Sequence, residues 1–164
     1  MNRNLLSVTI AATLCAMVYL GPSNAARAWE SNGCTLASVA GSFGFSYNGV
    51  GILPTGPVPV AAVGNLRTDN AGTLVGTETN SLGGNATDQT ILGNLTVNHD
   101  CSGTLVANVY EHGVLVRTSY IHVQYENNTS EILGIFQKLV LPNGSSLPVV
   151  IIIDGKRLFH DRGE

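Results

Sequence analysis

The side chain of this sequence that is best suited to chemistry is Glu78, and Tyr120 and His122 are its nearest candidate partners. A carboxylate that faces an apolar interior has a raised pKa and can act as an acid or a base, and an imidazole nearby would strengthen that case. The alternative, which we favour, is that Glu78 lies in water at a rim and that His122 makes structural hydrogen bonds. We name Glu78 and Tyr120 as the catalytic candidates. The candidate ligand-binding residues are Tyr47, Glu78, Tyr120, His122 and Gln137.

No familiar catalytic motif accompanies these residues. Gly49-Val50-Gly51 begins like a dinucleotide-binding loop, but it runs into Ile52-Leu53-Pro54 without the strand–turn–helix context that such a loop needs, so we interpret the segment as an ordinary loop. The sequence contains neither a P-loop nor a G-x-S-x-G nucleophile elbow. A Ser-His-Asp triad depends on geometry and stays open, although no serine has a recognisable setting.

A metal site needs several N, O or S ligands that converge on one point. His122 has only the weak ligands Tyr120 and Gln124 beside it. Glu111 and His112 are adjacent, and adjacent side chains diverge on a regular strand. The sequence therefore predicts no metal site and no cofactor.

The elements that must position these side chains are strands. Apolar and polar residues alternate with period two between turns rich in Gly, Asn, Asp and Pro, and no window has a helical pattern over three turns. Eight sequential strands with short turns predict an all-β fold, a closed antiparallel up-and-down barrel without free edges. The predicted strands lie near 41–48, 58–68, 73–80, 88–98, 103–111, 114–125, 130–141 and 147–154.

A repeat sets the predicted register. "GNLRTDNAGTLVGT" at 64–77 returns in longer form as "GNLTVNHDCSGTLVAN" at 93–108, and each copy is interpreted as a hairpin with its leucines inward. Two explanations remain for the inward glycines: kinks that let the strands coil into a barrel, which we favour, or small residues that leave a cavity. The predicted pairs are Gly64 with Gly76, Ala62 with Glu78, Leu95 with Leu105, and Gly93 with Ala107.

The later turns extend this register. A two-residue turn at His112-Gly113 pairs Glu111 with Val114, and a second at Asn127-Asn128 continues the register. The first predicts Val116, Thr118, Tyr120 and His122 on the inner face, and the second adds Leu133, Ile135 and Gln137. The last strands are also apolar on the other face, which predicts a covering segment or a homo-oligomer. The residues predicted on that outer face are Ile132, Phe136, Val140, Val149, Ile151 and Ile153.

The ends of the chain indicate export. A basic start, an apolar run from Leu5 to Leu20 and an Ala26-Arg27-Ala28 site predict a cleaved signal peptide over 1–28, and the run is too short for a stable membrane span. A single barrel domain over 29–156 and a polar tail over 157–164 are expected to follow. The predicted location is secreted or periplasmic.

The net charge argues against nucleic acid as a partner, and the cysteine content predicts a disulfide. The formal charge of −3 becomes about −5 once Arg3 and Arg27 are removed, and so acidic a domain is a poor partner for nucleic acid. Cys34 and Cys101 remain after cleavage, and in an oxidising compartment they most simply form one disulfide. A zinc site, the alternative, would want more ligands at close spacing.

Three segments carry a resemblance to a known group: "CTLASVAGSFGFSYNGVG", "GPVPVAAVGNLRTDNAGTLVGTETNSLGG" and "GNLTVNHDCSGTL". They resemble an uncharacterised family of small exported bacterial proteins, over roughly Cys34 to Ile153. The resemblance implies a calycin-like single barrel, similar in outline to allene oxide cyclases and lipocalins, and it supports the Cys34–Cys101 pairing. It implies no function, because barrels of this shape both bind and catalyse.

Three functional hypotheses follow. The leading one is an exported barrel that binds a small apolar molecule in its interior. The second is a cyclase or isomerase that folds a flexible apolar substrate, with Glu78 or Tyr120 steering charge. The third is a non-enzymatic structural or interaction protein with a packed core.

Overall fold

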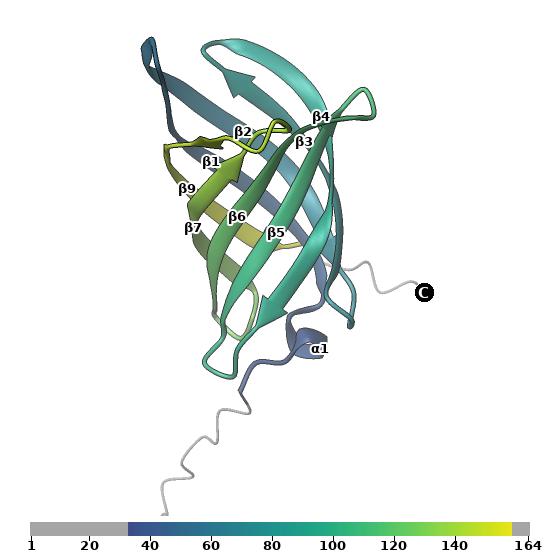
Figure 1. The fold of residues 1–164 in the computed structure, drawn as a ribbon. Coiled ribbons are helices and arrows are strands. Elements are labelled where there is room, and N and C mark those ends of the chain that lie inside the picture. Colours follow the sequence, from purple (N-terminus) through teal and green to yellow (C-terminus); the bar gives the residue numbers. More distant parts are fainter. Residues whose placement is uncertain (1–32, 159–164) are drawn as a thin grey trace, which may run out of the picture. The chain divides into compact units, whose positions relative to one another are not determined.

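Antiparallel strands make up most of the part of the chain that the computed structural model describes, residues 33–158 (Figure 1). One short helix, α1 (Leu36–Val39), precedes them. The strands are β1 (Gly41–Leu53), β2 (Gly56–Thr68), β3 (Thr73–Leu82), β4 (Asn85–Val97), β5 (Ser102–Glu111), β6 (Val114–Glu126), β7 (Glu131–Val140), β8 (Ser146–Leu147) and β9 (Val149–Arg157).

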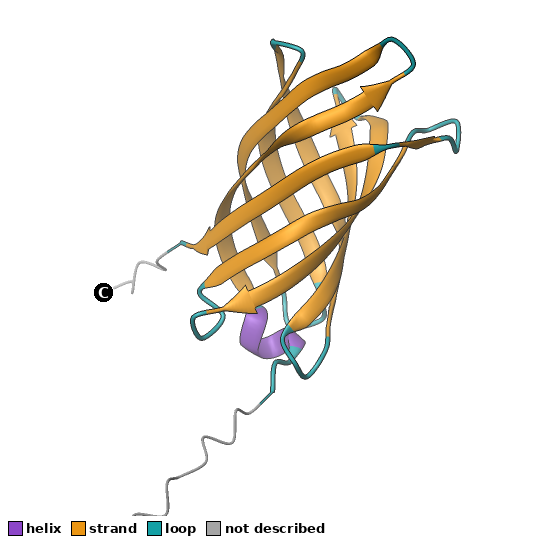
Figure 2. Ribbon diagram, turned by 90° about the vertical axis from the view of Figure 1, so that its left-hand side faces the viewer, coloured by secondary structure: helices purple, strands orange, loops and turns teal. Residues whose placement is uncertain are grey.

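The sheet closes on itself, as predicted. Consecutive strands pair from β1 to β7, β7 then pairs with β9, and β9 returns to β1. Figure 2 shows the tilted strands around the barrel, with α1 at one end. The predicted strand 147–154 is split at Pro148 into β8 and β9, because proline has no N–H to give to the ladder. The result is a closed barrel of eight antiparallel strands with a two-residue extension, β8.

The two hairpins of the repeat differ in how well their register was predicted. In the second, Leu95 lies opposite Leu105 and Gly93 opposite Ala107, as predicted. In the first, the pairs Gly64 with Gly76 and Ala62 with Glu78 were wrong by two residues. Asp69 accepts hydrogen bonds from the N–H groups of Ala71 and Thr73, so the turn is centred one residue later. Gly64 therefore lies opposite Glu78, Leu66 opposite Gly76, and Ala62 opposite Asn80.

Gly64, Gly76 and Gly93 face the concave side, on the same side of their strands as the buried leucines. A Cβ added to Gly93 would lie 1.9 Å from the carbonyl oxygen of Val106, and one added to Gly64 would lie 2.2 Å from that of Thr77. Neighbouring strands thus approach these glycines too closely for any side chain. The glycines allow the strands to coil, which was the favoured explanation.

Val116 packs against the core as predicted, but the inner face predicted for β6 from Thr118 onward was wrong because of a bulge. Val109 pairs with Arg117 but Tyr110 pairs with Leu115, so Val116 is an extra residue without a partner. A one-residue insertion exchanges the two faces of a strand. Tyr120, which is 37% exposed, and His122 therefore point outward. The inward residues of this strand are Arg117, Ser119, Ile121, Val123 and Tyr125.

The exchange continues into β7. Its turn, 127–130, is two residues longer than predicted and holds three positive-φ residues, and Gln137 lies unpaired at a second bulge, exposed to solvent. Ile132 and Phe136, predicted on the outer face, are buried inside, as are Ile151 and Ile153 of β9. The apolar residues that do lie exposed on these two strands are Leu133, Ile135, Val150 and Ile152, which we call the outer patch.

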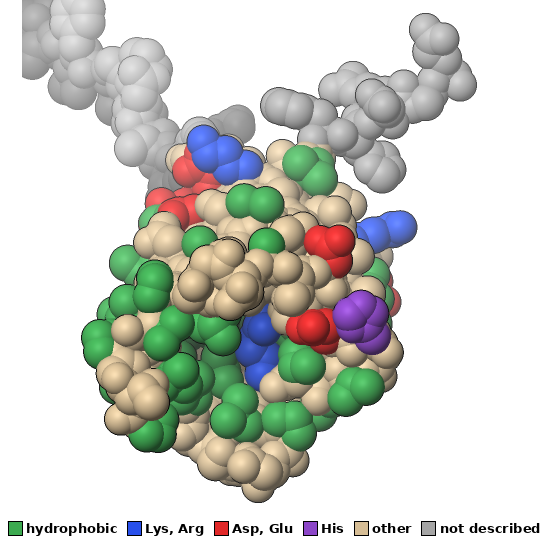
Figure 3. All heavy atoms as spheres, turned by 90° about the horizontal axis from the view of Figure 1, so that it is seen from above, with side chains coloured by type: hydrophobic (Ala, Val, Ile, Leu, Met, Phe, Trp, Pro, Cys, Tyr) green, Lys and Arg blue, Asp and Glu red, His purple; other side chains and the backbone are tan. Residues whose placement is uncertain are grey.

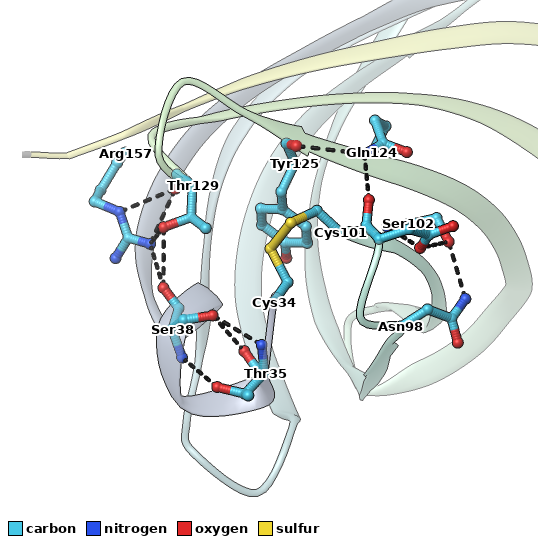
Figure 4. Close-up of a disulfide and its surroundings, with 11 residues drawn as sticks. Cys34, Thr35, Ser38, Asn98, Cys101, Ser102, Gln124, Tyr125, Thr129 and Arg157 are labelled. Atoms are coloured by element: carbon cyan, nitrogen blue, oxygen red, sulfur yellow. Dashed lines mark hydrogen bonds between the residues drawn. A yellow bond between two sulfur atoms is a disulfide. The ribbon is translucent and has the colours of Figure 1, made fainter. Parts of the chain in front are cut away.

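One end of the barrel is closed by α1 and a disulfide (Figure 4). Cys34 and Cys101 are bonded, as predicted, with their Cα atoms 4.8 Å apart. Thr35 caps α1 through a reciprocal bond with Ser38, and Val39 behind it is fully buried. From β9, Arg157 donates to the carbonyl oxygens of Ala40, directly after α1, and of Thr129 in the β6–β7 turn. Its guanidinium lies over the Phe43 ring, 4.7 Å from the centroid.

Two predicted boundaries change. The segment 49–53, expected as a loop, is the end of β1, because Pro54 and Thr55 alone form the turn to β2. Strand β9 includes Arg157, one residue beyond the expected domain end at 156. The predicted signal peptide over 1–28 lies outside the described residues. Within 33–158, no helix is long and apolar enough to cross a membrane.

Candidate functional site

The end of the barrel away from α1 holds a cavity of about 360 Å³. Strand β1 starts next to α1, and its Gly51, ten positions further on, lines the cavity. Figure 3 looks down this end and shows a hollow bordered by hydrophobic side chains, with Lys or Arg atoms at its floor. The apolar wall consists of Val60, Leu82, Val116, Phe136, Leu139, Leu141, Leu147, Val149 and Ile151.

The floor of the cavity is a polar network around Arg117. Of the described residues that line the cavity, Arg117 is the only lysine or arginine. Its Nη1 donates to Gln89 Oε1 at 2.8 Å, and its Nη2 donates to Tyr47 Oη at 2.9 Å and forms an ion pair with Glu78. We call Tyr47, Glu78, Asn80, Gln89 and Arg117 the floor network.

Tyr47 and its neighbours complete this network. The phenol oxygen of Tyr47 accepts from Asn80 Nδ2 at 2.6 Å and donates to Glu78 Oε1 at 3.2 Å. Gln89 uses its amide nitrogen to donate to Glu111 Oε2 at 3.1 Å, nearer the mouth. Each side chain of the floor network therefore fixes the orientation of another.

Local sequence explains how four strands deliver these groups. Glu78 and Asn80 alternate with outward threonines on β3, and Gln89 has the same parity on β4 as the buried Ile91 and Leu95. Arg117 enters the interior because the bulge at Val116 turns it inward. The floor network is thus built by ordinary strand alternation at three strands and by an irregularity at the fourth.

Burial controls the electrostatics of the floor. The side chain of Glu78 is 2% exposed and that of Arg117 is 13% exposed. Burial raises the pKa of Glu78 above its ordinary 4.5, while the charge and hydrogen bonds of Arg117 oppose the rise. Burial also raises the pKa of the Tyr47 phenol above 10.0, so Tyr47 stays protonated and donates a hydrogen bond to Glu78.

Below the floor network the barrel is nearly solid. A void of only about 30 Å³ remains there, between apolar side chains of the core and the undersides of Tyr47, Glu78 and Arg117. Ser119 Oγ borders this void and has no hydrogen-bond partner among the described residues. The interior is therefore hollow above Arg117 and packed below it.

The structure brings together two of the predicted site residues. Tyr47 and Glu78 share a hydrogen bond in the floor network, and Glu78 is buried rather than placed in water at a rim. Tyr120, His122 and Gln137 lie outside the barrel, so none of them reaches the cavity. Tyr120 instead packs its ring under Lys138, with Nζ 5.9 Å from the centroid.

Sequence reasoning missed Asn80, Gln89, Glu111 and Arg117. Counting in steps of two from the inward Leu95 reaches Gln89, and counting in the same way from the inward Leu105 reaches Glu111. Both residues could therefore have been predicted to face the interior. Asn80 shares the parity of Glu78. Arg117 has the parity of Ile121, Val123 and Tyr125, which alternate with polar residues, so counting back from them also leads to it. The prediction missed this signal because it counted the register of β6 from the turn without a bulge.

The arrangement is better suited to holding a molecule than to converting one. Glu78 lies behind Arg117 and is not among the residues that line the cavity. Its charge is already engaged by an ion pair, which leaves it a weak acid or base toward a ligand. Within residues 33–158, no three His, Cys, Asp or Glu side chains converge as metal ligands would.

Comparisons with known proteins do not assign the chain. No family model and no curated protein matches it, so the resemblance to calycin-like exported proteins stays a prediction. A solved structure, Rv2717c from M. tuberculosis, is similar at 12% sequence identity over 76% of this chain and 95% of that one, with a TM-score of 0.38. A likeness this distant says nothing about a ligand or an activity.

Proposed function

We propose that this protein is an exported barrel that binds a small, mainly apolar molecule in the cavity above the floor network. The cavity volume of about 360 Å³ lies at the low end of the usual range for ligand sites, about 300–1,000 Å³. At about 30 Å³ for a water-sized group, the space corresponds to roughly a dozen non-hydrogen atoms. Aliphatic walls and a few polar groups at one end are typical of such sites.

The contrast between the two halves of the barrel carries this proposal. Below Arg117 the same strands pack their side chains until only about 30 Å³ is left, whereas above it they leave more than ten times that volume. Protein interiors are close-packed, and unfilled apolar volume lowers stability. A barrel that needed only a core would be expected to fill both halves, so the third hypothesis, a fully packed structural protein, receives less support.

Catalysis is the weaker alternative. A cyclase or isomerase would need a charged group beside the substrate, and the buried Glu78, with its raised pKa, is the remaining candidate for that role. Arg117 stands between Glu78 and the cavity, so the carboxylate could act only through that guanidinium. Tyr120, the other candidate, points outward. The geometry therefore favours binding.

Export and self-association belong to the same proposal. The predicted signal peptide and the Cys34–Cys101 disulfide are both compatible with a secreted or periplasmic protein. The outer patch continues across two strands, since Ile135 lies opposite Ile152. Neighbouring exposed aliphatic side chains of this kind favour contact with a second copy of the chain.

Titration with the neutral fluorescent probe 1-aminonaphthalene, which is small enough for the cavity, tests the binding proposal. Val149 lines the cavity, while the next residue, Val150, points outward and is 61% exposed. Val149→Phe should fill part of the cavity and weaken probe binding at least fivefold, and the matched control Val150→Phe should leave it unchanged. The proposed binding function would be wrong if the wild-type barrel does not bind the probe, or if the two variants affect probe binding equally.

A further inference from the structure

We propose that the cavity selects ligands with an uncharged oxygen-bearing end, a hydroxyl or a carbonyl, over the carboxylates of the same chain length. This inference rests on the proposed function and names the chemical class that the site would accept. It follows from two properties of the floor network, its charge balance and the hydrogen-bonding groups that it leaves free.

The charge at the floor is already compensated. Arg117 supplies the one positive charge, and it forms an ion pair with the buried Glu78 directly behind it. Glu111 adds a second carboxylate on the cavity wall, linked to the guanidinium through Gln89. One cation therefore faces two carboxylates, and an incoming anion would meet a net negative surrounding. Like charges placed together in a desolvated site disfavour binding.

Hydrogen-bonding capacity nevertheless remains at the floor. Arg117 uses Nη1 and Nη2, and its Nε–H has no partner among the described residues. Asn80 gives one amide hydrogen to Tyr47, which leaves its second N–H and its Oδ1 without a partner in the described part of the chain. Both side chains line the cavity. A site with free donors and a free acceptor matches a hydroxyl, which can both donate and accept, and it matches a carbonyl through the donors.

The rest of the cavity offers the ligand apolar contact. The walls above the floor are mainly Val, Leu, Ile and Phe side chains, and the mouth is open to solvent in Figure 3. A ligand with its oxygen at Arg117 and Asn80 would place its hydrocarbon part along these walls. A simple probe pair for this class is 1-octanol and octanoate, which share a chain length and differ in charge.

The test measures both dissociation constants by ¹H–¹⁵N NMR titration at pH 7.5, with and without the charges of the site. The wild-type barrel should bind 1-octanol about tenfold or more tightly than octanoate. Glu78→Gln removes the compensating charge and should bring octanoate to equal or tighter binding than 1-octanol. Glu111→Gln leaves the buried ion pair intact, so it replaces the first variant if that one does not fold. It should improve octanoate binding severalfold relative to 1-octanol.

The outcomes separate this inference from the proposed function. Equal or tighter octanoate binding by the wild-type barrel overturns the head-group assignment and leaves the binding function standing. Binding of neither compound, while the neutral probe still enters, also overturns the assignment. Failure of the probe to enter at all overturns the proposed function itself. An unchanged preference in a folded Glu78→Gln or Glu111→Gln protein rejects charge balance as its cause.

Discussion

Replacing Arg117 by methionine should destabilise the barrel strongly, because it leaves the carboxylate of Glu78 buried without a counter-charge. Methionine keeps most of the side-chain volume, so packing changes little. The side chain of Glu78 is 2% exposed, and without Arg117 its remaining hydrogen bond comes from Tyr47 at 3.2 Å. One neutral donor cannot replace a guanidinium in compensating a buried charge.

The expected loss in the free energy of unfolding at pH 7.5 is about 3–5 kcal/mol, as is usual when one partner of a buried ion pair is removed. That is a large part of the 5–15 kcal/mol typical of a whole domain. The double variant Arg117→Met/Glu78→Gln removes the unpaired charge as well. We expect it to recover at least about 2 kcal/mol relative to the single variant, because a neutral amide is far less costly to bury than a charge.

Urea unfolding of the oxidised protein, followed at several pH values, measures these differences. Burial raises the folded-state pKa of Glu78 above its ordinary 4.5, and loss of Arg117 should raise it further. The folded state then binds a proton more tightly than the unfolded state. The contribution of Glu78 to the free energy of unfolding is therefore fully present below pH 4.5, and it is lost as the pH rises through the folded-state pKa. The deficit of Arg117→Met should accordingly shrink at pH 4 and be largest at neutral pH.

A different result would refute this account of the floor. If Arg117→Met costs under about 1 kcal/mol at pH 7.5, the value of an exposed pair, Glu78 is solvated in the native barrel. If the double variant is no more stable than the single one, the loss comes from packing and the pair carries no special charge coupling. Either outcome would also remove the charge balance from which the head-group preference follows.

Three further predictions concern the scaffold. Cys34→Ser/Cys101→Ser opens a loop with a sequence separation of 67 and should lower the free energy of unfolding by about 4 kcal/mol on the chain-entropy relation, measured against the oxidised protein in urea. Gly93→Ala should cost about 1–3 kcal/mol, because its Cβ would meet the carbonyl oxygen of Val106, while Asn94→Ala on the outward face should cost under about 0.5 kcal/mol. Ile152→Lys should convert a self-associated barrel to monomers, as measured by light scattering, whereas the control Asn94→Lys should leave it associated. A strictly monomeric wild-type protein would contradict the proposed oligomer.

The faces of the early strands were predictable because alternation alone decides them. From β1 to β5 the buried positions follow period two without interruption where the interior is packed, so the inward directions of Leu66, Leu74, Leu95 and Leu105 follow directly. The two-residue error in the first hairpin left these directions unchanged, since a shift of two preserves the face. The disulfide followed from the two cysteines that remain after the predicted signal peptide is removed.

The later strands were mispredicted for two different reasons. On β6 the alternation of Ile121 and Val123 with polar residues does mark the inner face, but the register counted from the turn contradicted it. The conflict between the two is resolved by one extra residue, Val116, whose position between Leu115 and Arg117 the alternation alone does not fix. On β7, Ile132 and Phe136 compete with Leu133 and Ile135 for the interior. Either assignment satisfies hydrophobic burial, and the choice depends on hydrogen-bond register over the whole barrel.

The bulge that defeated the prediction is also what builds the site. If β6 kept the register of its turn without a bulge, Val116 would pair with Val109, and Arg117 would point outward and leave Glu78 facing the interior alone. An isolated buried carboxylate is costly, so the carboxylate on β3 and the bulge on β6 depend on each other across the barrel. Bulges commonly redirect a side chain next to a functional site. Here the bulge places Arg117 at the boundary between the packed and hollow halves of the barrel. Among the described residues that line the cavity, Arg117 is the only lysine or arginine.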